Sequence, residues 1–353
     1  MKKINFIDSI KLSQTNCLKS NKKFCIVGIE TSYDKLGFKK KFPNQVFEMP
    51  VSELALSGLA VGLASQGYKP FVHHGRVEFA MLAFDQIFTQ ASKWNFMFGN
   101  DYPCPVSFKI SLGRRQGDGP QHTEGYHSIF FQSHGLDIFI PSTPQEAYDH
   151  ILSINKLKRP SVFLEHRRLY LTTQTLKKKN NEKCRAFLYG SSKKTLLITY
   201  ADGLIDCLNA KKILIDNNID ISVLCISKFI GENKFVDSDV SKVLDYENVI
   251  FFDTRPFSFG PLCSFLGLIK LRNHRSTINF FSISPPNQSC SASYKDMKIY
   301  YPTFYDIIKK VLRVEKKKIK INSVTDYNYL YNFPKLDFDE FQSCKKIFFN
   351  DIC

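Results

Sequence analysis

A glutamate at the start of an apolar helix is the first residue in this sequence whose position suggests chemistry. Residues 45–48 are typical of a short strand, Met49-Pro50 interrupts it, and a helix is predicted to begin near Ser52. The Ser52 hydroxyl can accept a hydrogen bond from an unpaired N–H of the first turn. Glu53 follows, where the helix dipole favours an ionised carboxylate. Glu53 therefore either serves only the helix dipole or supplies a carboxylate to a site.

A second candidate, His122, ends the glycine-rich stretch Gly117-Asp118-Gly119-Pro120-Gln121-His122. An imidazole titrates near neutrality, which suits proton transfer or the stabilisation of a developing alkoxide. Arg114 and Arg115 stand just before this stretch. They either bind a carboxylate or phosphate group of a substrate or face solvent. Gln121 and His127 are weaker candidates for substrate contact.

An aromatic side chain, Phe79, opens a long predicted helix over Val77–Met97. Four residues after it comes the segment Ala83-Phe84-Asp85-Gln86. Phe79 either packs in the core, as its many apolar neighbours suggest, or offers a face on which a flat ring stacks.

Strands alternate with helices along the chain, which predicts parallel, doubly wound sheets. The apolar run Phe24–Ile29 is typical of a strand buried on both faces. Further strands are predicted at 68–72, 105–111, 136–140, 161–164, 195–200, 221–226, 249–253 and 277–282, and helices at 122–134, from 144, at 204–215, 261–271 and 304–314. The polar interval 171–194 lacks periodicity. We therefore expect a first domain over 1–170, a linker over 171–194, a second domain over 195–315 and a basic, aromatic tail over 316–353.

The composition is that of a globular protein, with 43% hydrophobic and 23% charged residues. The formal net charge of +16 comes largely from lysine clusters such as Lys39–Lys41 and Lys316–Lys320, which are typical of solvated loops. No nucleic-acid-binding motif accompanies them. The ten cysteines form no C-x-x-C pair, and no apolar run reaches the ~18 residues that cross a bilayer. We expect a cytoplasmic protein that binds neither nucleic acid nor membrane.

Several of these segments together resemble thiamine-diphosphate enzymes. Pro50-Val51-Ser52-Glu53 and the helix behind it resemble the segment that carries the cofactor-activating glutamate in the beta subunit of the decarboxylating component of 2-oxo acid dehydrogenases. That subunit is similar to the last two domains of transketolase. The loop 117–122 resembles both the D-G-P-x-H of transketolases and the G-x-Q-H of the beta subunits, and Thr199–Gly203 resembles a turn of their C-terminal domain. The resemblance covers about residues 24–314 and implies a pyrimidine-binding domain followed by a transketolase C-terminal-like domain.

The resemblance also implies roles for the candidate residues. Glu53 would hydrogen-bond N1′ of the aminopyrimidine of thiamine diphosphate and so favour the tautomer that activates the thiazolium ring. Phe79 would stack on the pyrimidine, because family members carry an aromatic residue about one turn before an A-x-D-Q segment. His122 would face the thiazolium ring and the substrate.

Other positions depart from the family. The Ser-Arg pair with which transketolases hold a sugar phosphate is replaced by Glu165-His166-Arg167-Arg168, and His73-His74-Gly75 stands where an acidic or apolar entry is usual. The G-D-G…N-N fingerprint that binds diphosphate through Mg²⁺ is missing. We therefore expect no metal site on this chain, and a separate alpha-type subunit that brings the diphosphate and Mg²⁺, in an alpha2-beta2 assembly.

Three functions remain open. The first is decarboxylation of a 2-oxo acid with transfer of the acyl group, for which a lipoyl acyltransferase is a candidate partner. The second is a split transketolase that moves a two-carbon ketol unit between sugars, which the D-G-P-x-H loop favours and the missing Ser-Arg pair opposes. The third is a non-catalytic assembly subunit, against which the joint presence of Glu53, Phe79 and His122 argues.

Overall fold

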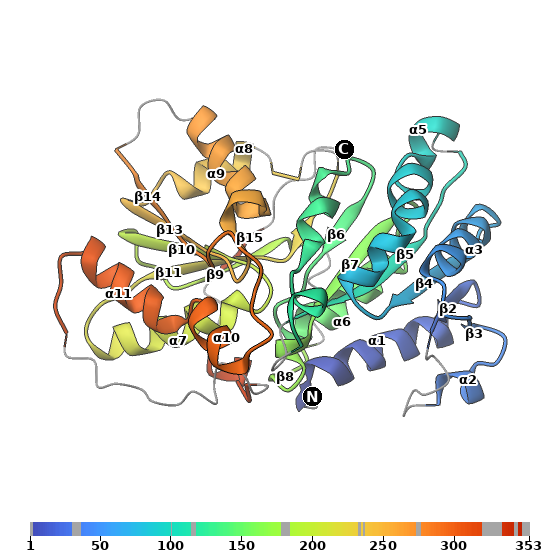
Figure 1. The fold of residues 1–353 in the computed structure, drawn as a ribbon, viewed down its shortest axis with the longest axis horizontal. Coiled ribbons are helices and arrows are strands. Elements are labelled where there is room, and N and C mark those ends of the chain that lie inside the picture. Colours follow the sequence, from blue (N-terminus) through green and yellow to red (C-terminus); the bar gives the residue numbers. More distant parts are fainter. Residues whose placement is uncertain are drawn as a thin grey trace.

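The computed structural model describes residues 3–29, 37–99, 101–113, 118–177, 184–231, 234–235, 237–272, 277–319, 334–341 and 345–347. Two sheets lie side by side, each covered by helices on both faces (Figure 1). The predicted α/β architecture is confirmed.

The first sheet is parallel through its centre, and its strands contain the buried apolar runs of the first half. Its strand order is β12 (Lys228–Phe229), β6 (Asp137–Phe139), β7 (Ser161–His166), β5 (Ser107–Leu112), β4 (Lys69–His74), β2 (Phe24–Gly28) and β3 (Val46–Glu48). Along β2, Phe24 and Ile26 pack under helices α1 (Phe6–Ser20) and α6 (Pro144–Ile154). Cys25 and Val27 point to the opposite face, under α3 (Glu53–Ser65). This alternation follows from the two-residue period of a strand.

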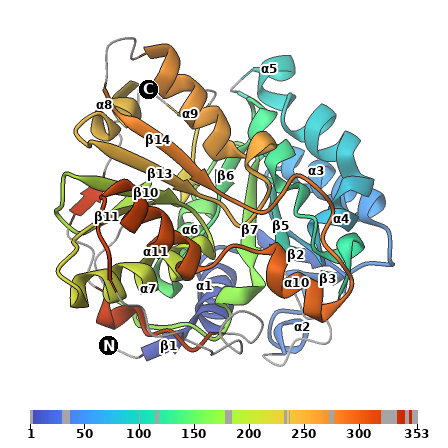
Figure 2. The same cartoon turned by 60° about the vertical axis from the view of Figure 1, so that its left-hand side comes forward.

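The second sheet has the order β14 (Asn279–Ile283), β13 (Asn248–Phe252), β10 (Thr195–Thr199), β11 (Ser222–Ile226), β9 (Ala186–Tyr189) and β15 (Lys345–Ile347). One face is covered by α7 (Gly203–Asp216) and α11 (Phe304–Val314), and the other by α8 (Asp237–Val243) and α9 (Pro261–Arg272), as Figure 2 shows. Short elements complete the chain: α2 (Phe38–Lys41), α10 (Tyr294–Tyr300), and the pair β1 (Lys3–Asn5) with β8 (Thr173–Thr175).

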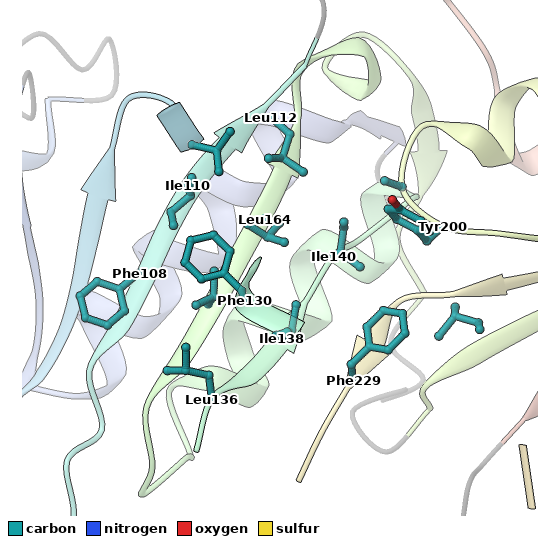
Figure 3. Packing of buried hydrophobic residues seen from close by; sticks show 14 of the residues in the cluster. Phe108, Ile110, Leu112, Phe130, Leu136, Ile138, Ile140, Leu164, Tyr200 and Phe229 are labelled. Carbon is teal, nitrogen blue, oxygen red and sulfur yellow. The ribbon is translucent and has the colours of Figure 1, made fainter. Parts of the chain in front are cut away.

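The two halves share one apolar core. Phe108, Ile110 and Phe130 of the first half belong to the same buried cluster as Tyr200 and Phe229 of the second (Figure 3). Strand β12, from the second half of the sequence, pairs with β6 at the edge of the first sheet. Apolar contacts and strand pairing therefore both join the two halves.

Two predicted helices differ from the structure. The helix expected over Val77–Met97 is a succession of α4 (Val77–Ala80), a 3₁₀ turn, a π-helical stretch (Asp85–Ala91) and α5 (Trp94–Phe98). The helix expected at 122–134 is two 3₁₀ segments, separated where Gly125 adopts φ +72°. That left-handed conformation, which glycine tolerates, ends a right-handed helix.

Within the interval 171–194, expected as a linker, the described residues 171–177 and 184–194 include strands β8 and β9. The division into two domains at this interval remains a prediction. Of the tail 316–353, only residues 316–319, 334–341 and 345–347 lie within the described part of the chain. None of the described helices is long and apolar enough to cross a membrane.

Candidate functional site

The three main candidate residues lie at one edge of the first sheet. Strands β3, β2, β4 and β5 run parallel, so their carboxyl ends share an edge. Glu53 follows β3, Phe79 follows β4, and His122 follows β5. The carboxyl edge is where open parallel sheets bind ligands. The fold therefore brings together residues that are far apart in the sequence.

Glu53 is the first residue of α3, as predicted. The Ser52 hydroxyl accepts from the Ala55 N–H at 3.3 Å and caps the helix. The glutamate is only 9% exposed, and no described group hydrogen-bonds its carboxylate. The carboxylate is therefore left available at this edge of the sheet, which favours a ligand-binding role over a simple contribution to the helix dipole.

One turn into α3, Ser57 anchors the helix to the neighbouring strand. Its hydroxyl lies 3.0 Å from Nε2 of His74, and burial lowers the pKa of His74 to about 4. His73 lies 3.0 Å from the Gln14 amide nitrogen, and burial lowers its pKa as well. Both histidines are therefore neutral. Their contacts hold β4 against α3 and α1, so they serve structure rather than substrate binding.

Phe79 and His122 contact each other. Their ring centroids are 5.6 Å apart and their planes meet at 85°. Phe79 is 39% exposed, so the alternative of an ordinary core residue does not hold. An exposed aromatic face next to an imidazole can receive a flat heterocycle.

Arg76, which sequence reasoning missed, holds the His122 loop. Its Nη1 donates to the His122 carbonyl at 2.8 Å, and its Nη2 donates to Asp118 at 3.2 Å. Glu78 accepts from the Gly125 N–H at 3.2 Å. The turn before Phe79 thus positions the backbone of the loop that carries His122. The sequence offers only one hint, namely a charged residue between a strand end and a candidate aromatic.

The remaining candidate residues differ in whether the structure describes them and in where they lie. Arg114 and Arg115 lie outside the described residues. Gln121 is exposed next to His122. His127 is buried and turns away into the second half of the chain, where its Nε2 lies 3.0 Å from the Tyr200 hydroxyl.

The His127 contact belongs to a buried polar cluster at the carboxyl edge of the second sheet. The Tyr200 hydroxyl donates to Asp253 at 3.0 Å, and Asp253 also accepts from the Arg255 N–H. Burial raises the pKa of Asp253 to about 7, and burial together with the Arg255 charge lowers the pKa of His127 to about 3. A Cβ on Gly125 would lie 2.3 Å from Nε of Arg255. The second half therefore packs tightly against the His122 loop.

The run Glu165–Arg168, which replaces the family's Ser-Arg pair, is committed to contacts within the protein. Glu165 pairs with Lys109 at 2.6 Å, and Arg168 with Asp206 at 2.6 Å. Arg167 donates to the Ser111 hydroxyl at 3.0 Å and to the Gly75 carbonyl at 3.0 Å. These side chains are therefore engaged in structure.

Large apolar side chains are exposed around the site. They lie before and on α3 and on residues 82–98 and 101–102, and within these residues the 3₁₀ turn and the π-helical stretch contact α3. They are Val51, Leu54, Leu59, Leu82, Phe84, Phe96, Met97, Phe98 and Tyr102, with exposures from 43% to 80%. We call this set the apolar face. Such a gathering of exposed apolar residues is typical of a protein–protein interface. The described residues contain no group of three or more metal-ligating side chains.

Several known proteins are similar to this chain. Residues 18–172 match the family model "Transketolase, pyrimidine binding domain". The chain is 28% identical over 186 residues to the "Pyruvate dehydrogenase E1 component subunit beta" of Rickettsia felis, covering 52% of this chain and 56% of that protein. It is 27% identical over 177 residues to the "2-oxoisovalerate dehydrogenase subunit beta" of Bacillus subtilis, covering 48% and 54%. The matches thus span little more than half the length of these relatives.

Among solved structures, a "Split gene transketolase, inactive beta4 tetramer" superposes with a TM-score of 0.72 at 16% identity, covering 90% of this chain and 99% of that one. The fold is therefore that of the transketolase pyrimidine-binding and C-terminal domains. The similarity to dehydrogenase beta subunits, inferred from the sequence, is confirmed.

Proposed function

We propose that this chain is the beta-type subunit of a heteromeric thiamine-diphosphate enzyme that decarboxylates a 2-oxo acid and transfers the acyl group. The observation that carries the proposal is Glu53, a nearly buried carboxylate without a described partner at the carboxyl edge of the first sheet. The similarity to beta subunits of pyruvate and 2-oxoisovalerate dehydrogenases supports the choice of reaction. We assign the enzyme to the cytoplasm.

The residues present fit the pyrimidine half of the cofactor. Thiamine diphosphate, when bound, supplies the carbanion and the electron sink that cleavage next to a carbonyl requires. Glu53 would hydrogen-bond the pyrimidine ring, and Phe79 would stack on it, a contact worth roughly 0.5–1.5 kcal/mol. His122, next to Phe79, would hold or move a proton at the substrate oxygen. Arg76 would keep the His122 backbone in place.

A partner subunit completes this proposal. The described residues offer no metal-ligand cluster for Mg²⁺, so we assign diphosphate and metal binding to an alpha-type subunit. The apolar face gives that subunit a surface to bury. The split-gene transketolase that shares this fold is described as inactive in its beta4 form, which supports an alpha2-beta2 assembly as the active unit. A lipoyl acyltransferase would then accept the acyl group.

A split transketolase is the second candidate. The high coverage of the split-gene transketolase chain favours it. Against it stands Arg167, whose guanidinium is bound to Ser111 and Gly75 rather than free for a sugar phosphate.

The test is calorimetric titration of thiamine diphosphate and Mg²⁺ into the complex purified with its alpha-type partner, followed by turnover assays with 2-oxo acids and with ketose phosphates. We expect binding and 2-oxo acid turnover in the wild type. Glu53→Gln should lower turnover by at least 100-fold, whereas Glu48→Gln, which removes an exposed carboxylate five residues earlier, should not. Turnover of ketose phosphates alone would select the second candidate. No cofactor binding, or full activity of Glu53→Gln, would refute both.

A further inference from the structure

A cavity in the second half of the chain lies outside the site described above. Its volume is about 570 Å³, and it opens between the end of β14, helix α10 and helix α11. Its walls come entirely from residues 282–313, which include none of the candidate site residues. Small-molecule pockets typically measure about 300–1,000 Å³, so the cavity is large enough for a metabolite.

Three cations line one wall of this cavity. Lys309, Lys310 and Arg313 all project from α11. Lys309 and Arg313 are four residues apart, so they lie one above the other on the same helix face. None of the three forms an ion pair with a described residue. Three basic groups on the wall of a cavity, none of them paired with an acidic group in the described part of the chain, favour an anion there.

The single carboxylate of the same wall is already engaged. Asp306 accepts from the Thr303 N–H at 2.9 Å and from its hydroxyl at 3.3 Å, as part of the capping box that begins α11. Its charge is therefore directed toward the helix N-terminus, where it is favourable. It offsets only one of the three positive charges.

The alternative is that these cations serve structure alone. The Lys310 ammonium lies 5.3 Å from the Phe281 ring centroid and Lys309 lies 5.8 Å from that of Tyr305, and Arg313 suits the last turn of a helix. Each contact explains one side chain. None explains why all three line the same cavity, which Tyr300 also lines.

The geometry points to a binding site for a small phosphorylated molecule in this cavity. Lysine and arginine bind phosphate oxygens through charge-assisted hydrogen bonds, and Tyr300 with Pro286 and Pro302 provides apolar surface for the rest of the ligand. This inference is independent of the proposed catalytic function, because it uses neither the same residues nor the same edge of a sheet.

The experiment titrates inorganic pyrophosphate, and separately inorganic phosphate, into the full chain, with hydrogen–deuterium exchange to locate the protected amides. The test variant is Lys309→Ala/Arg313→Ala. The control is Lys19→Ala/Lys22→Ala, which removes the same charge from exposed positions on and after α1. We expect saturable wild-type binding with protection in 282–313, at least tenfold weaker binding in the test variant, and unchanged binding in the control.

Two results would overturn the inference. One is the absence of saturable binding of either anion to the wild type. The other is an equal loss in both double variants, which would mean that the anions respond only to the net charge of +16.

Discussion

The carboxyl edges of the two sheets have the same architecture, but their side chains differ in whether other parts of the protein contact them. At the first edge, Glu53 has no described partner and Phe79 is partly exposed. At the second edge, Tyr200, Asp202 and Asp253 are buried; Tyr200 donates to Asp253, and Tyr200 and Asp202 contact His127 and Arg168 of the first half. In doubly wound sheets this edge is the usual ligand position. Here the second edge is filled by the first half of the chain, so the polar residues of the second edge stabilise an interface while those of the first remain available.

The largest effect is expected at the second edge. Arg168 is 4% exposed and pairs with Asp206 at 2.6 Å and Asp202 at 3.5 Å. Arg168→Ala leaves buried carboxylates without their cation, which typically costs about 3–5 kcal/mol. Denaturant unfolding should reveal this loss, while Lys193→Ala, which breaks an exposed pair with Asp245, should change stability by less than about 0.5 kcal/mol. An Arg168→Ala protein as stable as the wild type would contradict the conclusion that the polar residues of the second edge stabilise the interface.

Two histidines five residues apart sharpen the comparison. His122→Asn should lower kcat/KM of the complex by roughly 100-fold or more and leave the unfolding free energy nearly unchanged, because its ring is partly exposed next to Phe79. His127→Ala should do the reverse, since it leaves the buried Tyr200 hydroxyl without one of its partners. Steady-state kinetics and unfolding curves of both variants would test this. Equal effects of the two substitutions on turnover would contradict it.

The pH dependence of stability should report Asp253. Its native pKa is about 7, whereas an unfolded aspartate titrates near 4. The native state thus binds more protons between these values, so this group costs stability as the pH rises from about 4 to 7. Relative to the wild type, Asp253→Asn should gain stability across that window, by on the order of 4 kcal/mol. Asp245→Asn, at an exposed position, should show no such trend. If the stability difference between Asp253→Asn and the wild type does not change with pH, Asp253 does not carry a proton in the native state.

The smallest effect is expected at Arg76. Arg76→Lys keeps the charge but cannot bond the His122 carbonyl and Asp118 together in the same geometry. Loosening the loop should lower kcat by about tenfold with little change in KM, and the pH profile of kcat should shift. Arg76→Met should be worse than Arg76→Lys. A change in stability alone would assign Arg76 to structure.

Much of the fold was predictable because the buried strands are continuous apolar runs. Phe24–Gly28, Thr195–Thr199 and Ser222–Ile226 lie within a residue of the predicted positions. Strands β12 and β15 were missed because they span two and three residues and exist only through pairing with distant segments. The predicted helix at 122–134 failed at Gly125, where the backbone adopts φ +72° and Arg255 of the second half occupies the space that a side chain would need.

The site residues were predictable where the neighbouring sequence alone indicates their position. Ser52 as a cap and Glu53 in the first turn follow from the residues themselves. Arg76 is recognisable only once His122, 46 residues later, is placed beside it. The role of His127 likewise depends on Tyr200, 73 residues away. Contacts between segments distant in sequence carry no periodic signal, so reading along the chain could not find them.

Strand β12 also determines how a chain truncated between the two halves would behave. Lys228 and Phe229 close the outer edge of the first sheet by pairing with β6, and Gly231 donates to Asp137 of the same strand at 3.0 Å. A fragment ending near residue 175 would keep every candidate catalytic residue and lose this cover. It would present β6 as an open strand edge, which invites chains to join edge to edge. Such a fragment should accumulate as aggregates, so the first half depends on the second half for solubility.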